Sequence, residues 1–388
     1  MQALILAGGF GTRLKDILPD LPKPLAPIDN VPFLLYLLTH LSKHNINNVT
    51  LLTGYKSEAI ENFIQNVKLS INIEIIKENM PLGTAGALFN AWNKLEPEFY
   101  LINGDSYFDA DLSLLDNYFR DKSIFALLAL RYSQDAARYG NVNFNDEFKV
   151  TSFIEKNTYS NNVDCFINAG LYKFNKSILT SHYNSWDGGF LSIENSIFPK
   201  MVEEGILYGL PVGGLFIDIG IAEDYRKANV IIPNRIAETV TPALFLDRDN
   251  LLIEDNGYTY GTDLKFLTKA DTYIKKANTE KQPVIVVSNQ SGVARGYFLE
   301  EDVMITNNVV KTNFLNKGLV INDFYYCPYH PDGKIEKYKK FSYSRKPYPG
   351  MILSACEKYK IDLKGSLMIG DNPVADNIKL PYLNCKII

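Results

Sequence analysis

The stretch ALILAGGFGTRL, residues 3–14, carries a short apolar run directly into a glycine-rich loop. The apolar run predicts a buried β-strand. The loop glycines lack a Cβ atom, so the backbone can approach a ligand closely, and consecutive N–H groups there can surround an anion. Arg13 adds a cation beside the loop, and Lys23 follows in LPKPL. Because such a loop also occurs as a simple turn, other segments are needed to distinguish the two.

Apolar runs alternate with helical patterns along the whole chain. The predicted strands cover residues 3–7, 49–54, 71–76, 99–104, 243–247, 283–289, 366–371 and 384–388. Predicted helices cover 32–44 and 84–94. The alternation predicts an α/β protein with two domains, each a mostly parallel sheet flanked by helices. The polar, proline-bracketed segment 231–242 predicts the boundary, giving domains at 1–235 and 240–388.

The composition excludes several classes of protein. Of the 388 residues, 46% are hydrophobic and 22% are charged, which is typical of globular domains. The net charge of -4 provides no basic field for nucleic acid. The four cysteines form no CxxC pair, which argues against a disulfide framework. The N-terminal apolar run is too short to span a membrane and is a poor signal peptide, so we expect a cytoplasmic location.

Further motifs in the first half favour a nucleotide site. ENMPLGTAGAL (78–88) places a second small-residue loop before a predicted helix. Asp105 and Asp218 each follow an apolar run, where open α/β sheets bind ligands. Two such carboxylates suit a Mg²⁺ ion that also binds phosphate oxygens. Either aspartate alone is more often a turn residue or a helix cap.

Residues 1–230 resemble the sugar-1-phosphate nucleotidyltransferases, a Rossmann-like family. The segments MQALILAGGFGTRL, LPKPLAPIDNVPFL and FIDIGIAEDY look most like its heptose 1-phosphate guanylyltransferases, except that Ala222 replaces a frequent proline. The resemblance implies that the triphosphate is held by Gly8, Gly9, Gly11, Thr12, Arg13 and Lys23. It further implies the base and sugar contacts Glu78 and Gly83, the Mg²⁺ ligands Asp105 and Asp218, and the sugar-phosphate contacts Glu155, Lys156, Asn168 and Glu194.

The residue types agree with that chemistry. A sugar phosphate oxygen attacks the α-phosphorus of a nucleoside triphosphate, and pyrophosphate leaves. The attacking oxygen is already ionised near neutral pH, so the reaction needs alignment and charge neutralisation rather than a strong general base. Mg²⁺, Arg13, Lys23 and Lys156 are suited to that role.

A different signature begins at LFLDRDN, residues 244–250. Alternation along an extended segment places Asp247 and Asp249 on the same side. One carboxylate could then attack a phosphomonoester, while the other gives a proton to the leaving alcohol. Two aspartates in this spacing are also found as a metal site or as two solvated carboxylates.

The segments that follow complete a phosphatase pattern. SNQSGVARG, RKP and IGDNPVADN supply a hydroxyl, a lysine and an acid in the order of the haloacid dehalogenase superfamily. Residues 240–388 resemble its capless heptose bisphosphate and histidinol-phosphate phosphatase branch. The resemblance implies Asp247 as nucleophile, Asp249 as acid and base, substrate contacts at Ser288, Asn289, Arg295, Arg345 and Lys346, and Mg²⁺ at Asp247, Asp249 and Asp371. Arg345 would reach a second substrate phosphate, and the loop from Cys327 to Lys346 would set specificity.

That loop departs from the branch pattern. Members usually hold it with zinc, but Tyr329, Ser342 and Ser344 stand where ligands would be, and only Cys327 remains. Because structural zinc needs about four N or S ligands, we expect no zinc. The aromatic residues of the segment predict one packed cluster in its place: Phe324, Tyr325, Tyr326, Tyr329, Tyr338, Phe341, Tyr343 and Tyr348. Asn250, where glycine is usual, is tolerated if the position needs a positive φ.

Together the two resemblances imply consecutive reactions. A phosphatase that removes the 7-phosphate of heptose 1,7-bisphosphate produces heptose 1-phosphate, which the guanylyltransferase converts with GTP to GDP-heptose. Small-molecule substrates are therefore the expected partners, with a homo-oligomer also open. The alternatives are another sugar such as mannose, another base, an inactive regulatory second half, or a scaffold without catalytic activity.

Overall fold

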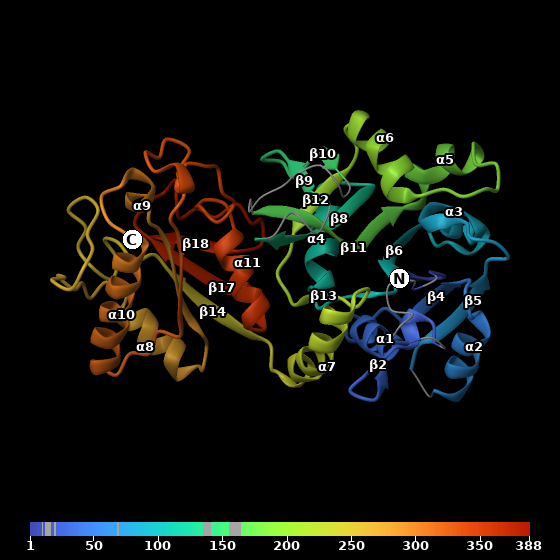
Figure 1. The fold of residues 1–388 in the computed structure, drawn as a ribbon, viewed down its shortest axis with the longest axis horizontal. Helices are drawn as coiled ribbons and strands as arrows, with labels where there is room; N and C mark the ends of the chain where they lie inside the picture. The colour runs from blue at the N-terminus through green and yellow to red at the C-terminus, as the bar shows by residue number, and fades with distance from the viewer. Residues whose placement is uncertain (10, 12–16, 19–20, 68–69, 135–140, 155–163) are drawn as a thin grey trace. The chain divides into compact units, whose positions relative to one another are not determined.

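The computed structural model describes residues 1–388 except 10, 12–16, 19–20, 68–69, 135–140 and 155–163. The chain divides into two compact units, Met1–Asn161 with Phe166–Glu238, and Asn162–Cys165 with Thr239–Ile388. Figure 1 traces the first unit from blue to green and the second from yellow to red. Both have the predicted α/β architecture.

The described part of the first unit contains a nine-stranded sheet with the main order β10-β9-β11-β6-β1-β4-β5, extended by β8 and β12. Its strands are β1 (Gln2–Ala7), β4 (Asn48–Thr53), β5 (Asn72–Lys77), β6 (Glu98–Asn103), β8 (Ala126–Ser133), β9 (Asn141–Phe144), β10 (Val150–Ile154), β11 (Cys165–Asn175) and β12 (Tyr208–Pro211). Strands β6, β1, β4 and β5 are parallel, with Ile5 of β1 beside Leu51 and Ile102. Since β11 runs antiparallel to β6, the sheet is mixed.

Two small sheets complete this unit. The strands β2 (Pro27–Ile28) and β3 (Val31–Pro32) pair with each other, and β7 (Ser106–Phe108) pairs antiparallel with β13 (Phe216–Asp218). The β7–β13 pair brings the chain after β6 beside a segment more than a hundred residues later. This pairing joins the two predicted metal-binding segments.

The helices of the first unit are α1 (Phe33–Lys43), α2 (Ser57–Asn66), α3 (Gly83–Asn90), α4 (Leu112–Asp121), α5 (Thr180–Asn184), α6 (Phe198–Glu203) and α7 (Ala222–Ala237). Helix α1 buries Leu34, Leu37, Leu38 and Leu41, the spacing that gives a helix one apolar face. The helix predicted at 84–94 ends at Asn90 and is followed by a 3-10 turn.

The predicted linker 231–242 is helical up to Ala237, because α7 continues through Pro233. Proline removes one helical hydrogen bond, but packing of the helix compensates for it. Ile232 and Arg235 are buried, and Arg235 Nε donates to Asp109 Oδ2. A proline-containing polar segment can therefore remain helical when its neighbours are anchored.

The second unit is built on a five-stranded parallel sheet, counted over its described residues, with the order β16-β15-β14-β17-β18. The strands are β14 (Thr241–Leu246), β15 (Val284–Asn289), β16 (Asp323–Cys327), β17 (Ile361–Gly370) and β18 (Asn384–Ile387). The helices are α8 (Asp271–Thr279), α9 (Gly292–Arg295), α10 (Glu300–Asn316) and α11 (Gly350–Lys358). Strand order reverses at β14, so a ligand crevice is expected at its carboxyl end.

Apolar alternation explains the core of this unit. Leu244 and Leu246 of β14, Val284 and Val286 of β15, and Ile369 of β17 are buried together with Ile274 and Phe314. Strand β14 is thus held between β15 and β17, and its packing fixes the position of the residues that follow it. Among the described residues, no helix is both long enough and apolar enough to cross a membrane.

Two candidate active sites

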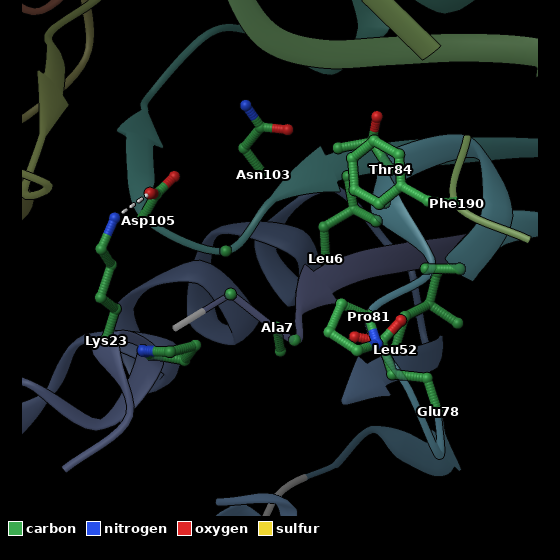
Figure 2. A pocket seen from close by; sticks show the side chains of 16 residues that line it. Leu6, Ala7, Lys23, Leu52, Glu78, Pro81, Thr84, Asn103, Asp105 and Phe190 are labelled. Atoms are coloured by element: carbon green, nitrogen blue, oxygen red, sulfur yellow. Dashed lines mark hydrogen bonds and ion pairs between the residues drawn. The ribbon is translucent and has the colours of Figure 1, made fainter. Parts of the chain in front are cut away.

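The first site is a cavity of about 330 Å³ in the first unit. It lies where β1, β4 and β6 end, and Figure 2 shows its side chains. The lining residues are Leu6, Ala7, Gly8, Gly9, Lys23, Pro24, Leu52, Glu78, Pro81, Gly83, Thr84, Ala87, Asn103, Gly104, Asp105 and Phe190. Of the predicted residues, the cavity therefore brings together Gly8, Gly9, Lys23, Glu78, Gly83 and Asp105.

Two glycines in this wall have a clear physical reason. A Cβ on Gly8 would lie 2.7 Å from Glu78 Oε1, so any larger residue would force this carboxylate to shift. Gly83 has a φ of +74° and its Cβ would lie 2.6 Å from the Leu191 carbonyl oxygen. Both positions bring backbone close to the space a nucleotide would fill.

Glu78 follows β5 and lies half-buried in the cavity wall. Its Oε2 accepts a hydrogen bond from the Leu82 N–H at 3.2 Å. Burial raises the pKa of Glu78, although the Leu82 hydrogen bond opposes the shift. The carboxylate keeps further acceptor positions for a ligand.

Lys23 and Asp105 form an ion pair, with Lys23 Nζ 2.8 Å from Asp105 Oδ2 (Figure 2). The Ile219 N–H donates to the Asp105 carbonyl at 2.9 Å, and Asp218 is in register with Ser106. The two predicted metal carboxylates thus sit on neighbouring backbone segments. Carboxylate oxygens are ligands that suit Mg²⁺.

The predicted sugar-side residues are partly placed. Glu194 Oε2 accepts hydrogen bonds from Thr84 Oγ1 at 2.7 Å and from Ser192 Oγ at 2.8 Å. Asn168 Nδ2 donates to the Tyr172 hydroxyl at 2.8 Å, and its Oδ1 accepts from the Gly170 N–H at 2.9 Å. Gly11 is described, with a φ of +62°. Four predicted residues lie outside the described residues: Thr12, Arg13, Glu155 and Lys156.

Sequence reasoning missed other lining residues. Asn103 and Thr84 stand inside the motifs NGD and PLGTAGA, so position within a motif could have indicated them. Phe190 is 72% exposed and still lines the cavity. It reaches the cavity from a segment about a hundred residues further along, and no local pattern indicates it.

The second site lies at the carboxyl end of β14. Asp247 Oδ1 is 2.8 Å from Lys346 Nζ, which is also 2.6 Å from Asp376 Oδ1. One oxygen each from Asp247, Asp371 and Asp376 lie within 4.8 Å of one another, a spacing that could hold a metal ion. Asp376 was not among the predicted site residues, although it stands five positions after Asp371 in the motif IGDNPVADN.

Charge is concentrated here in a dry environment. Burial raises the pKa of Asp247 to about 7, while the nearby Lys346 ammonium opposes that shift. For Lys346, burial alone would lower the pKa, but the Asp247 and Asp376 carboxylates raise it overall. Lys346 therefore stays charged and can neutralise an incoming phosphate.

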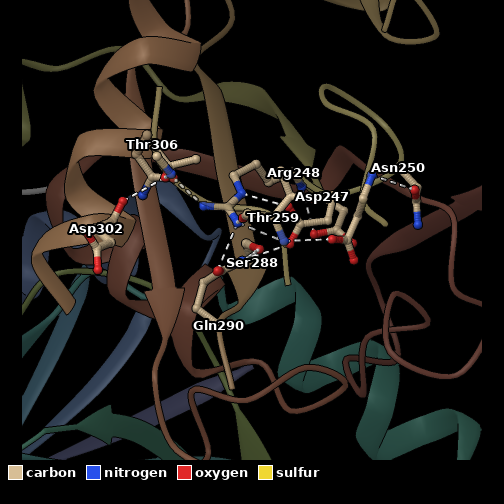
Figure 3. Close-up of polar contacts among 12 residues, drawn as sticks. Asp247, Arg248, Asn250, Thr259, Ser288, Gln290, Asp302 and Thr306 are labelled. Atoms are coloured by element: carbon tan, nitrogen blue, oxygen red, sulfur yellow. Dashed lines mark hydrogen bonds and ion pairs between the residues drawn. The ribbon is translucent and has the colours of Figure 1, made fainter. Parts of the chain in front are cut away.

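Asp249 does not belong to the group of three carboxylates. Its Oδ1 accepts from Arg248 Nε at 2.8 Å, and its Oδ2 accepts from Gln290 Nε2 at 2.8 Å (Figure 3). Asn250 has a φ of +56°, so the position does need a positive φ, the case in which asparagine is tolerated in place of glycine. The turn leads the chain away while Asp249 remains at the site.

Two further predicted residues differ in their surroundings. Ser288 is 3% exposed and its Oγ accepts from Gln290 Nε2 at 2.8 Å, which leaves its own proton for a ligand. Asn289 uses both polar atoms on the backbone of Lys346: its Nδ2 donates to the carbonyl at 3.1 Å, and its Oδ1 accepts from the N–H at 2.9 Å. Asn289 thus holds Lys346 in place.

Three basic side chains gather beside the second site. Arg295 Nη2 is 3.4 Å from His330 Nε2. Arg295 Nε and Arg345 Nη1 are buried without a hydrogen-bond partner among the described residues. Burial and the neighbouring Arg295 lower the pKa of Arg345, and burial, Arg345 and Arg295 lower that of His330. This basic cluster of Arg295, His330 and Arg345 is therefore short of negative charge.

The loop from Cys327 to Lys346 is packed differently from the single aromatic cluster predicted. Phe341, Tyr343 and Tyr348 form one edge-to-face trio with centroids 4.9–5.5 Å apart. Tyr326 and Tyr338 instead donate hydrogen bonds to Glu300 at 3.1 and 2.7 Å. The prediction of one cluster is wrong because phenol groups seek an acceptor when buried. Burial raises the pKa of Cys327 to about 11, so this thiol is protonated near neutral pH.

Comparison with known proteins gives the family of the chain. The first unit has a nucleotidyltransferase fold, and the chain belongs to the nucleotidyl transferase family, whose model matches residues 2–235. A second model, described as HAD-hydrolase-like, matches residues 343–378, which include Lys346, Asp371 and Asp376. The expected two-part organisation, a nucleotidyltransferase followed by a haloacid dehalogenase-like segment, is confirmed.

The particular relatives narrow the family further. The chain is 40% identical over 230 residues to the D-glycero-alpha-D-manno-heptose 1-phosphate guanylyltransferase of Aneurinibacillus thermoaerophilus, covering 59% of this chain and 96% of that protein. It is 37% identical over 225 residues to the enzyme of the same name from Campylobacter jejuni, covering 58% and 97%. The crystal structure of HddC from Yersinia pseudotuberculosis complexed with GMP-PN matches with a TM-score of 0.52 and 33% identity, over 59% of this chain and 97% of that one.

Proposed function

We propose that the first unit transfers GMP from GTP to D-glycero-α-D-manno-heptose 1-phosphate, giving GDP-heptose and pyrophosphate. The observation that carries this proposal is that Lys23, Asp105 and Glu78 line one cavity of about 330 Å³. Two heptose 1-phosphate guanylyltransferases are similar to this chain over 96% and 97% of their own length, which supports the choice of sugar and base. Lys23 would neutralise charge on the triphosphate, and the glycine loop would bind its oxygens through backbone N–H groups.

We also propose that Asp105 and Asp218 hold Mg²⁺, which would neutralise phosphate charge when bound. The cytoplasm stays the predicted location, and an assembly of several copies stays a prediction. Phosphoryl transfer of this kind requires little covalent help from the protein, because the sugar phosphate is itself the nucleophile. The chain's task is to align two anions against their mutual repulsion.

Glu78 explains why the base would be guanine. Guanine presents N1–H and N2–H₂ as adjacent donors, and a carboxylate accepts from both. Uracil and thymine present one N–H between two carbonyl oxygens, which a carboxylate disfavours. A site built around buried acceptors rejects ligands that leave them unpaired. Glu78, half-buried in the cavity wall, fits the guanine pattern.

Replacing Glu78 by glutamine should therefore lower kcat/KM for GTP by about 10- to 100-fold, the usual cost of a lost charged hydrogen bond. The amide should at the same time narrow the preference for GTP over UTP. The measurement is pyrophosphate release from a panel of nucleoside triphosphates. Glu74→Gln, at an exposed glutamate on the preceding strand β5, is the matched control. An unchanged GTP:UTP ratio in the Glu78 variant would contradict this role.

For the second unit we propose hydrolysis of the 7-phosphate of D-glycero-D-manno-heptose 1,7-bisphosphate. The arrangement that supports it is Asp247 beside the buried Lys346, with Asp249 and Ser288 facing the same end of β14. Asp247 would attack phosphorus, and the bond from phosphorus to the sugar oxygen would break as Asp249 gives that oxygen a proton. Water would then attack the aspartyl phosphate, lose a proton to Asp249 and release inorganic phosphate.

The basic cluster supports a substrate with a second anionic group. Arg295 Nε and Arg345 Nη1 are buried there without a hydrogen-bond partner among the described residues. Buried donors of this kind are costly unless a ligand supplies acceptors. Guanidinium groups bind phosphate well because their planar donors match its oxygens. A sugar bisphosphate would meet both requirements, with one phosphate at Asp247 and the other at the basic cluster.

Arg345→Gln should accordingly raise KM for the bisphosphate by about tenfold or more, since charge-assisted hydrogen bonds contribute roughly 1.5–3 kcal/mol. Hydrolysis of p-nitrophenyl phosphate, which has a single phosphate, should change by less than about threefold. Phosphate release from the two substrates measures both effects. Lys334→Gln, exposed in the same loop, serves as the control. Equal losses on both substrates would argue against a second-phosphate contact.

A further inference from the structure

Arg248 lies between the two aspartates of the second site and is only 1% exposed. Its Nε donates to Asp249 Oδ1 at 2.8 Å, and its Nη2 lies 3.4 Å from Asp249 Oδ2. A buried cation is costly, so its retention here calls for a specific arrangement of partners.

The rest of the Arg248 guanidinium is bound by residues from distant segments. Nη1 donates to Asn307 Oδ1 at 3.2 Å, and Nη2 donates to the Thr259 carbonyl at 3.3 Å. Thr306 fixes the loop that carries Thr259, because its Oγ1 accepts from the Gly261 N–H at 2.8 Å. The Arg248 guanidinium is therefore fixed by both α10 and this loop. Lysine could not replace Arg248, because a lysine side chain lacks the planar set of donors.

Gln290 completes the arrangement from the end of β15 and is 3% exposed. Its Oε1 accepts from Arg248 Nη2 at 2.9 Å, while its Nε2 donates to Asp249 Oδ2 and to Ser288 Oγ, both at 2.8 Å. Its own backbone N–H donates to the Cys327 carbonyl at 2.8 Å. Every polar atom of this amide has a partner, so its orientation is fixed.

We propose that Arg248 and Gln290 are positioning residues that hold the Asp249 carboxylate toward the oxygen of the leaving alcohol. This inference rests on the proposed phosphatase function and deepens it. The Asp249 side chain is 22% exposed and would otherwise rotate about two torsions. Proton transfer needs the donor within hydrogen-bond reach, and a misplacement of about 1 Å can cost on the order of 100-fold in rate. Gln290 would orient Ser288 toward the phosphate through the same amide.

The leaving group provides the test. An alkyl phosphate needs a proton on its departing oxygen, whereas p-nitrophenolate leaves without one. The kcat/KM value covers the steps up to departure of the alcohol and excludes hydrolysis of the aspartyl phosphate. In the full-length Gln290→Met chain, kcat/KM for heptose 1,7-bisphosphate should fall by about 10- to 100-fold, against less than about threefold for p-nitrophenyl phosphate.

The comparison includes variants that separate positioning from folding. Arg248→Lys keeps the positive charge but loses the planar guanidinium donors. It should lower kcat/KM for heptose 1,7-bisphosphate relative to kcat/KM for p-nitrophenyl phosphate, as Gln290→Met does. Gln282→Met, at a partly exposed glutamine whose Nε2 donates to Glu280, should leave that ratio unchanged. In an Asp249→Asn chain, adding Gln290→Met should change the ratio no further, because both substitutions would act through one carboxylate.

Two results would overturn the inference. Equal losses on both esters in the Gln290→Met chain would show a general structural defect instead of a positioning role. An unchanged ratio would show that Asp249 does not depend on the amide. Failure of the proposed function looks different, since the unaltered chain would then release no phosphate from heptose 1,7-bisphosphate.

Discussion

Asp247→Asn should abolish phosphate release and leave nucleotidyl transfer unchanged. The amide cannot attack phosphorus as a carboxylate does, and removal of a covalent nucleophile typically costs on the order of 10⁴-fold or more in kcat. Lys346 keeps its ion pair with Asp376, so the buried lysine does not lose all compensation. The measurement is inorganic phosphate from heptose 1,7-bisphosphate, with pyrophosphate from GTP and heptose 1-phosphate followed on the same preparation.

The exposed Asp263→Asn change in the same unit is the matched control and should affect neither product. Loss of both activities in the Asp247 variant would contradict the assignment of one reaction to each unit. Full phosphate release would show that another group is the nucleophile.

Asp105→Asn should impair nucleotidyl transfer and leave phosphate release unchanged, the opposite of Asp247→Asn. It should lower kcat/KM for pyrophosphate release by about 100- to 1,000-fold, as expected when charge stabilisation at a phosphate is lost. Phosphate release from the bisphosphate should stay within about twofold, because the substitution leaves every side chain of the second unit unchanged. Lys23 would also lose the carboxylate 2.8 Å away that orients its ammonium.

The matched control for this change is Asp111→Asn, at the N-cap of α4, where asparagine is an equally good cap. Titration with Mg²⁺ adds a second readout, since a metal ligand should raise the Mg²⁺ concentration needed for half-maximal rate. An Asp105 variant with the unaltered rate and Mg²⁺ requirement would exclude Asp105 from the metal site.

Local sequence patterns predicted the parts of the molecule that depend on neighbours in the chain. Strand β1, Gly8 and Gly9 after it, and Asp247 after β14 all follow from short segments. Each of these features is set by apolar alternation or by backbone conformation within a few residues. Such features can be recognised without knowing which segments meet in space.

Features that depend on distant segments were missed or assigned differently. Gln290 stands inside the quoted motif SNQSGVARG, yet its importance comes from Asp249 and Arg248, some forty residues earlier. Asn289 was expected to contact substrate, but the structure uses both its polar atoms on Lys346. Glu300 accepts hydrogen bonds from the Tyr326 and Tyr338 hydroxyls, where a single aromatic cluster was predicted. These contacts are chosen by tertiary packing, which no local spacing encodes.

The most direct test of two consecutive reactions in one chain is mass spectrometry of a single mixture. Purified protein would be incubated with Mg²⁺, GTP and each anomer of D-glycero-D-manno-heptose 1,7-bisphosphate. The account predicts inorganic phosphate, pyrophosphate and the mass of GDP-heptose from one anomer. Unchanged bisphosphate, together with no GDP-heptose when heptose 1-phosphate is supplied directly, would contradict it.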